Sequence, residues 1–231
     1  MTTPKWSSFP RKWMFDRLSR FPAGAQAGAH MAALRVYLAL ALRADFNDRT
    51  ASVSLTELQT LTGLSRPMVT KGIAKAASTE LVAVDNSGYR HSYRLLGQED
   101  DTAFAKIPKS RLRQQLPKLP TRGFHALDAL KVYLALVLVR PRDSFTLPIS
   151  VRLLAARSGV QPRRVRAAID VLINHRLVRL VEVDGESGAH GHHAYRLLGF
   201  DVSDAADEVS ETTHVANRGS RLAEPGYVDM S

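Results

Sequence analysis

The sequence contains no cysteine, which excludes disulfide bonds and thiolate metal sites. Long apolar runs are also missing. The longest, residues 31–42 and 129–139, are too short to span a bilayer, and each contains a cation. The N-terminal residues lack the apolar region and small-residue cleavage site of a secretory signal. We therefore expect a cytoplasmic protein with no membrane segment, in a reducing compartment.

Acidic residues are scarce in most of the chain. The net charge is +10, from 32 Lys and Arg against 22 Asp and Glu. Residues 200–231 hold seven of the acids and two of the bases, which leaves a net charge of +15 in residues 1–199. Such a basic region indicates a polyanionic partner, because neutralised phosphates release their condensed counterions. The acidic end lacks apolar periodicity, and we expect residues 201–231 to be disordered.

The chain contains an internal repeat. The segment ALRVYLALAL at residues 33–42 returns as ALKVYLALVL at residues 129–138, an offset of 96. The segment YRLLG at residues 93–97 returns at residues 195–199, an offset of 102. A Pro-containing lead-in precedes each copy, and Phe9-Pro10-Arg11 parallels Ile107-Pro108-Lys109 at an offset of 98. One unit is therefore present twice.

Each copy begins with a dense apolar segment, residues 31–44 and 127–140, that predicts a mostly buried helix. In copy one, Ser54 and Glu57 form a capping-box pattern that starts the next helix, which ends near Thr62. Gly63 suits the left-handed conformation that terminates a helix. Ser65 is then expected to cap a further helix with Pro67 in its first turn.

Copy two repeats this arrangement with a helix from about Val151 to Ser158, Gly159 at the turn, and Gln161 at the cap position. Helix, glycine-centred turn and helix with cations on the outer side form the helix-turn-helix pattern. A strand, a turn and a second strand follow in each copy, at residues 81–84 and 89–96 and at residues 177–183 and 194–198. Each hairpin is interpreted as a wing.

The predicted fold is therefore mainly helical with small β wings, an α+β protein with two tandem winged helix-turn-helix domains. Residues 1–29 form a basic, aromatic lead-in that is expected to pack on the first domain, residues 30–98. Residues 99–126 form a linker and the lead-in to the second domain, residues 127–200, and the acidic tail follows.

At Thr62-Gly63-Leu64-Ser65-Arg66-Pro67-Met68-Val69 the sequence resembles bacterial winged helix-turn-helix DNA-binding proteins. Residues 104–113, 129–134, 158–160 and 172–178 resemble the winged-helix domains of plasmids, integrative elements and phages, which include regulators and replication initiators.

This resemblance implies that the outer side of the second helix of each pair enters the major groove, where Arg can bond guanine and Gln can bond adenine. Further cations and the wings would contact phosphates. The candidate DNA-binding residues are Ser65, Arg66, Thr70, Lys71, Lys75 and Arg90 in copy one, and Gln161, Arg163, Arg164, Arg166, Arg176, His190 and His192 in copy two.

The two sets of candidates differ, since Thr70 corresponds to Arg166 and Lys71 to Ala167. Two unlike recognition helices in one chain are expected to prefer an asymmetric DNA site or two unlike half-sites, with centres about one helical turn apart. Either domain alone is expected to bind far more weakly than the intact chain.

The expected role is a transcriptional regulator of a mobile element that binds duplex DNA and acts on RNA polymerase. A replication initiator that binds repeated sites and recruits host replication proteins is the alternative, and RNA binding is a third reading. Homodimerisation stays open. His190, His192 and His193 are interpreted as wing residues, because no acidic or cysteine partner completes a metal site. No catalytic residues, metal or cofactor are expected.

Overall fold

The computed structural model describes residues 5–87, 91–97, 104–141, 144–183 and 192–200. Within these ranges the chain is an α+β protein in which helices combine with small antiparallel sheets. No helix of the described part is both long and apolar enough to cross a membrane. The expected tail, residues 201–231, lies outside the described residues.

The repeat of the sequence is a repeat of structure. The first copy contains β1 (Trp6–Pro10), α1 (Arg11–Leu18), α2 (Ala27–Arg43), β2 (Thr50–Ser52), α3 (Leu55–Thr62), α4 (Arg66–Ser78), β3 (Val82–Asp85) and β4 (Ser92–Leu95). The second contains β5 (Phe104–Pro108), α5 (Lys109–Gln115), the 3-10 helix η1 (Leu116–Lys118), α6 (Phe124–Val139), β6 (Thr146–Pro148), α7 (Val151–Ser158), α8 (Pro162–Asn174), β7 (Val178–Val183) and β8 (His192–Leu197). We call these two copies the first and second repeat.

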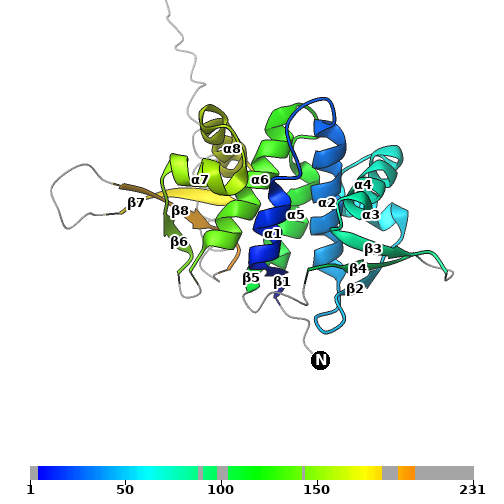
Figure 1. The fold of residues 1–231 in the computed structure, drawn as a ribbon. Coiled ribbons are helices and arrows are strands. Elements are labelled where there is room, and N and C mark those ends of the chain that lie inside the picture. Colours follow the sequence, from blue (N-terminus) through cyan, green and yellow to red (C-terminus); the bar gives the residue numbers. More distant parts are fainter. Residues whose placement is uncertain (1–4, 88–90, 98–103, 142–143, 184–191, 201–231) are drawn as a thin grey trace, which may run out of the picture.

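The central helices α2 and α6 lie side by side in the middle of the molecule (Figure 1). They are buried along nearly their whole length, as the dense apolar segments predict. Each begins three or four residues earlier than predicted. The prediction missed the first turn because this turn includes exposed residues, such as Gly28 and Phe124, that do not belong to the buried segment. One hydrophobic core extends through both repeats.

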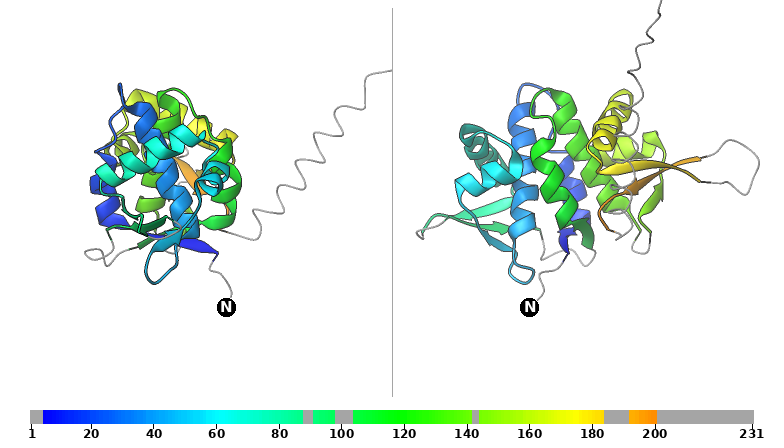
Figure 2. Two further views of the ribbon diagram at one scale, coloured as in Figure 1. Left: turned by 90° about the vertical axis from the view of Figure 1, so that its right-hand side faces the viewer. Right: turned by 180° about the vertical axis from the view of Figure 1, so that it is seen from behind.

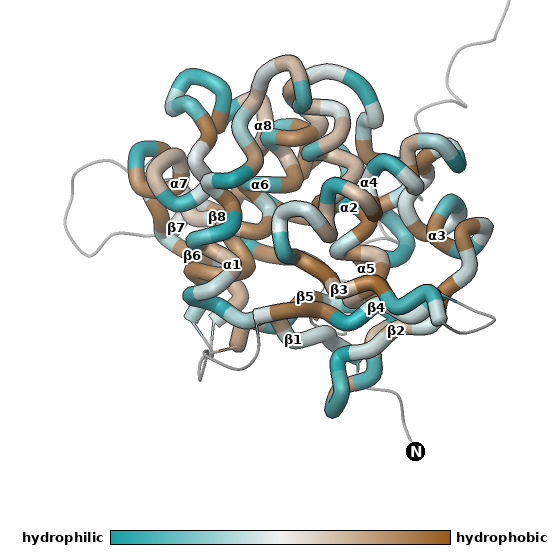
Figure 3. The backbone as a smooth tube through the Cα atoms, turned by 45° about the vertical axis from the view of Figure 1, so that its right-hand side comes forward, coloured by the Kyte–Doolittle hydropathy of each residue, from teal (hydrophilic) through white to brown (hydrophobic). Residues whose placement is uncertain are grey.

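Each repeat has a three-stranded antiparallel sheet, in the order β2-β4-β3 or β6-β8-β7. The two sheets lie on opposite sides of the molecule, as the front and rear views show (Figures 1 and 2). The buried Tyr93 and Tyr195 occupy the middle strands. Hydrophobic segments are concentrated inside and hydrophilic turns lie outside (Figure 3).

The lead-ins join the two repeats. Strand β1 pairs antiparallel with β5, a contact between segments about 98 residues apart that no local sequence pattern predicts. Strand β1 packs on α2, but helix α1 packs against α6 and α7 of the second repeat. Conversely, α5 packs on α2, and η1 packs on α3, of the first repeat.

Residues 1–29 were expected to pack on the first domain. Helix α1 contacts both repeats, because it packs on α6 and α7 and its Arg17 also forms an ion pair with Glu80 of the first repeat. Met14 and Leu18 bury the apolar side of this helix, and Arg11 donates to the carbonyl oxygens of Leu138 and Arg140 at the end of α6. The Arg157 guanidinium of α7 lies 5.5 Å from the centre of the Phe15 ring. The shared apolar surface, rather than proximity in sequence, determines where the lead-in helix docks.

Candidate nucleic-acid interface

The turn between α3 and α4 is fixed by local hydrogen bonds. The Ser54 hydroxyl accepts from the Glu57 amide at 3.1 Å, which starts α3 as the capping pattern predicts. Gly63 ends the helix with φ of +68°, a left-handed conformation that favours glycine. The buried Thr62 hydroxyl accepts from the Leu64 amide at 3.3 Å and so holds the turn. These features confirm the predicted boundaries.

The second repeat builds the same turn, with Ser158 in place of Thr62. The Ser150 hydroxyl accepts from the Leu153 amide at 3.2 Å and caps α7. Gly159 adopts φ of +63°, and the buried Ser158 hydroxyl accepts from the Val160 amide at 3.3 Å. The helix from Val151 to Ser158 is therefore confirmed.

Close packing against α2 determines which side of α4 faces outward. Val69, Gly72 and Ala76 are buried on the inner side. A Cβ atom on Gly72 would lie 2.8 Å from the Ala32 carbonyl oxygen, so the two helix backbones approach as closely as glycine allows. The opposite side of α4 must therefore face away from the core.

The outer face of α4, defined as Ser65, Arg66, Thr70 and Lys71, is exposed. Ser65 occupies the N-cap position, but its side chain makes no capping hydrogen bond, contrary to expectation. Lys75 differs from these candidates. It is half-buried, and its ammonium group donates to the Gln26 side-chain oxygen at 2.9 Å, which directs it toward the start of α2.

The outer face of α8, defined as Gln161, Arg163 and Arg166, is exposed as well. Gln161 stands at the N-cap position without a capping bond, and its side-chain oxygen accepts from Arg163 Nε at 3.3 Å.

Arg164 does not belong to this exposed face. Its guanidinium forms an ion pair with the Asp128 carboxylate of α6 and lies 4.5 Å from the centre of the Phe124 ring. Asp128 is only 2% exposed, and a buried carboxylate requires a counter-charge. Burial raises the pKa of Asp128, and Arg164 opposes that rise. Arg164 therefore differs from the other predicted contacts of α8, because its guanidinium is paired with a carboxylate of α6.

One position at the base of the hairpin has opposite charges in the two repeats. Arg176 is exposed, with a left-handed φ of +52°, two residues before β7. Its repeat mate Glu80 has φ of +59° and forms ion pairs with Arg17 at 2.7 Å and Arg20 at 3.0 Å. Of these two repeat mates, the second repeat therefore has the cation and the first repeat the ion-paired carboxylate.

Of the remaining candidates in the hairpins, the structure describes only His192. Arg90 and His190 lie outside the described residues. His192 is the first residue of β8, which begins two residues before the predicted strand. Within the described part of the chain, no group of three or more histidines and carboxylates is placed to hold a metal ion.

No protein-family model matches this chain, and a comparison with curated proteins gives no significant match.

Two buried cations, which were not among the predicted site residues, position the turns. Arg35 of α2 donates to the Thr62 carbonyl oxygen at 2.7 Å, and Lys131 of α6 donates to the Gly159 carbonyl oxygen at 3.1 Å. Burial lowers the pKa of Arg35 to about 10 and that of Lys131 to about 8. The available signal was a cation at the same place in both copies of an otherwise apolar helix.

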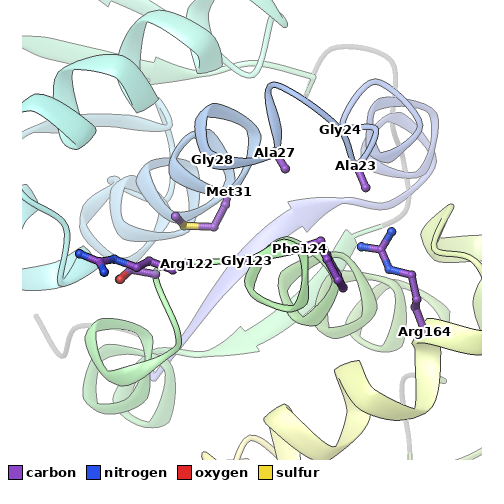
Figure 4. Close-up of a pocket in the computed structure, with 10 residues that line it drawn as sticks. Ala23, Gly24, Ala27, Gly28, Met31, Arg122, Gly123, Phe124 and Arg164 are labelled. Atoms are coloured by element: carbon purple, nitrogen blue, oxygen red, sulfur yellow. The ribbon is translucent and has the colours of Figure 1, made fainter.

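A hollow of about 630 Å³ lies between the repeats, at the N-terminal ends of α2 and α6 (Figure 4). Its lining combines the apolar Met31 and Phe124 with the guanidinium groups of Arg122 and Arg164. Sequence reasoning did not single out Arg122, which is exposed and belongs to neither outer face. The α4 and α8 outer faces remain the surfaces on which the candidate residues gather.

Proposed function

We propose that this protein binds double-stranded DNA sequence-specifically through two winged helix-turn-helix units. One observation carries the proposal: in both repeats, a helix, a left-handed glycine and a second helix present an exposed, cationic outer face, and an antiparallel hairpin follows. This is the local arrangement that places a recognition helix in the major groove and a hairpin beside it.

The exposed side chains suit base and phosphate recognition. Arg66 of α4 and Arg163 and Arg166 of α8 are of the type that bonds guanine at two acceptors, and Gln161 can bond adenine in the same way. Lys71 and Arg176 supply positive charge for phosphate oxygens. The net charge of +15 in residues 1–199 favours binding to a polyanion.

The test is selection of binding sites from random duplex DNA, followed by affinity measurements with Arg66→Ala and Arg166→Ala. Each change should weaken binding to the selected site by about 1–3 kcal/mol and relax the preference at one base pair. Lys12→Ala is the matched control, because it removes one exposed cation from α1, outside both outer faces. Unchanged affinity in both outer-face variants, or tighter binding to RNA than to duplex DNA, would contradict the proposal.

We further propose that the DNA contact serves transcriptional regulation of a mobile element. Recovery of bound DNA from cells should then yield a promoter, with transcript levels that change when the protein is removed. Recovery of an array of direct repeats beside an AT-rich segment would instead support a replication initiator.

A further inference from the structure

The pairing of β1 with β5 relates the two repeats by a local two-fold rotation. In the antiparallel register, Ser8 pairs with Lys106, Ser7 with Ile107 and Phe9 with Ala105. At the lead-in offset of 98, Ser8 and Lys106 are themselves repeat mates. At the centre of the ladder, a residue of the first repeat therefore lies opposite its own repeat mate. Replacing each residue by its mate converts the pair on one side of this centre into the pair on the other side. This is the arrangement of an isologous interface.

The buried cations show the same reciprocity. Arg35 donates to the Leu119 carbonyl oxygen at 2.6 Å, and its mate Lys131 donates to the Phe21 carbonyl oxygen at 3.0 Å. Phe21 and Leu119 are also repeat mates, at the same offset of 98. Each central helix therefore bonds the lead-in of the other repeat at the equivalent atom.

Helix packing extends the relation across the whole molecule. The first lead-in helix contacts α6 and α7, and the second lead-in segment contacts α2 and α3. Within the repeats, α4 packs on α2 as α8 packs on α6. The shared core and the buried bonds oppose rotation of one repeat against the other.

We infer that the DNA target carries its two half-sites in inverted orientation, a conclusion that rests on the proposed DNA-binding function. A two-fold arrangement of recognition helices matches DNA sites whose halves are related by the dyad of the duplex. Tandem domains on a free linker would have no such restriction. Because the outer faces of α4 and α8 differ, the two inverted halves have unlike sequences, and inspection of the natural site would not reveal their orientation.

The decisive experiment makes the two faces identical. The exposed residues of α4 are replaced by their α8 equivalents, while Met68 is kept because its mate Arg164 is bound to Asp128. The substitutions are Ser65→Gln, Arg66→Pro, Pro67→Arg, Thr70→Arg, Lys71→Ala and Ala74→Asp. The reverse variant changes α8 to the α4 residues at the equivalent exposed or half-buried positions, namely Gln161→Ser, Pro162→Arg, Arg163→Pro, Arg166→Thr, Ala167→Lys and Asp170→Ala. Thermal unfolding establishes which of the two variants is folded, and each provides an independent test.

Selection from random duplex DNA should give an inverted repeat for either matched-face variant. Synthetic duplexes with the same half-site and the same centre-to-centre spacing then separate orientation from sequence. The inverted duplex should bind about 100-fold more tightly than the direct duplex, because only the inverted one engages both repeats at once. Enrichment of a direct repeat, or equal affinity for the two orders, would overturn the inference while leaving DNA binding intact. Failure of the wild type and both variants to enrich any duplex would overturn the proposed function itself.

Discussion

Arg35 is the residue at which the structure makes its sharpest prediction about stability. The side chain is fully buried, and it donates to three carbonyl oxygens: those of Thr62 at 2.7 Å, Leu119 at 2.6 Å and Pro120 at 2.7 Å. Replacement by Met keeps an apolar stem of similar length but leaves these acceptors unpaired. Since the carbonyls belong to both repeats, the change acts on the joint between them.

The magnitude follows from two opposing contributions. Unpaired buried acceptors cost about 1–3 kcal/mol each, so three of them cost about 6 kcal/mol. Burial of the guanidinium is itself unfavourable, as the lowered pKa of about 10 shows. That shift from 12.5 corresponds to about 3 kcal/mol, which Met recovers. Arg35→Met should therefore lower the free energy of unfolding by about 3 kcal/mol, a large part of a typical total.

Urea unfolding followed by circular dichroism measures this loss, with the slope used to detect any change in the surface exposed on unfolding. The matched variant is Arg35→Lys, because the second repeat already uses Lys131 at this position with two carbonyl acceptors. We expect Arg35→Lys to lose only about 1 kcal/mol. The reasoning is refuted if Arg35→Met loses less than that, or if Arg35→Lys is as destabilised as Arg35→Met.

Further predictions use the same unfolding assay. Gly159→Ala should lose about 1–2 kcal/mol through its left-handed backbone, whereas Gly63→Ala should lose more, because its Cβ would lie 2.2 Å from the Pro117 carbonyl oxygen; equal losses would contradict the tight contact. Gly28→Ala should gain about 0.5–1 kcal/mol, since a Cβ there meets nothing within 4 Å, and a loss would count against that open geometry. Burial lowers the pKa of Lys131 to about 8 from 10.5, so between these pH values the folded state releases its proton before the unfolded state does. The free energy of unfolding should accordingly rise from pH 8 to 10.5 by roughly 3 kcal/mol from this group, and Lys131→Met should lack that increment; an identical pH profile in the variant would be inconsistent with the assignment.

The turns between paired helices were predictable because their determinants are local. A serine cap, a helical apolar pattern and a glycine at the end lie within a dozen residues, and Ser54, Gly63 and Gly159 occupy the predicted places. Exposure of the outer faces followed from the same periodicity, since burial of one side of a short helix determines the other.

What escaped prediction depends on contacts between distant segments. The β1–β5 ladder joins two five-residue strands from different repeats, and a short strand gives no signal about its partner. Arg164 resembles its exposed neighbours in sequence, but it forms an ion pair with Asp128, which lies 36 residues earlier in the chain. Lys75 turned toward Gln26 for a similar reason, across a separation of 49 residues. A periodic pattern assigns a side chain to a face but does not determine which neighbour it meets there.

Because each lead-in packs on the other repeat, separating the repeats is expected to affect folding as well as DNA binding. Weak DNA binding by either half was expected because the second contact would be lost, but each half also lacks the lead-in that covers its central helix and first turn helix. Fragments 1–100 and 101–231 should therefore be poorly folded when expressed separately. Mixed during refolding, they should assemble across the β1–β5 ladder and recover cooperative unfolding, and Arg35→Met in the first fragment should weaken that assembly. Analytical ultracentrifugation and circular dichroism on the separate and mixed fragments measure this directly. Two fragments that each unfold cooperatively alone and do not associate would show that the lead-ins are dispensable and that the repeats are independent domains after all.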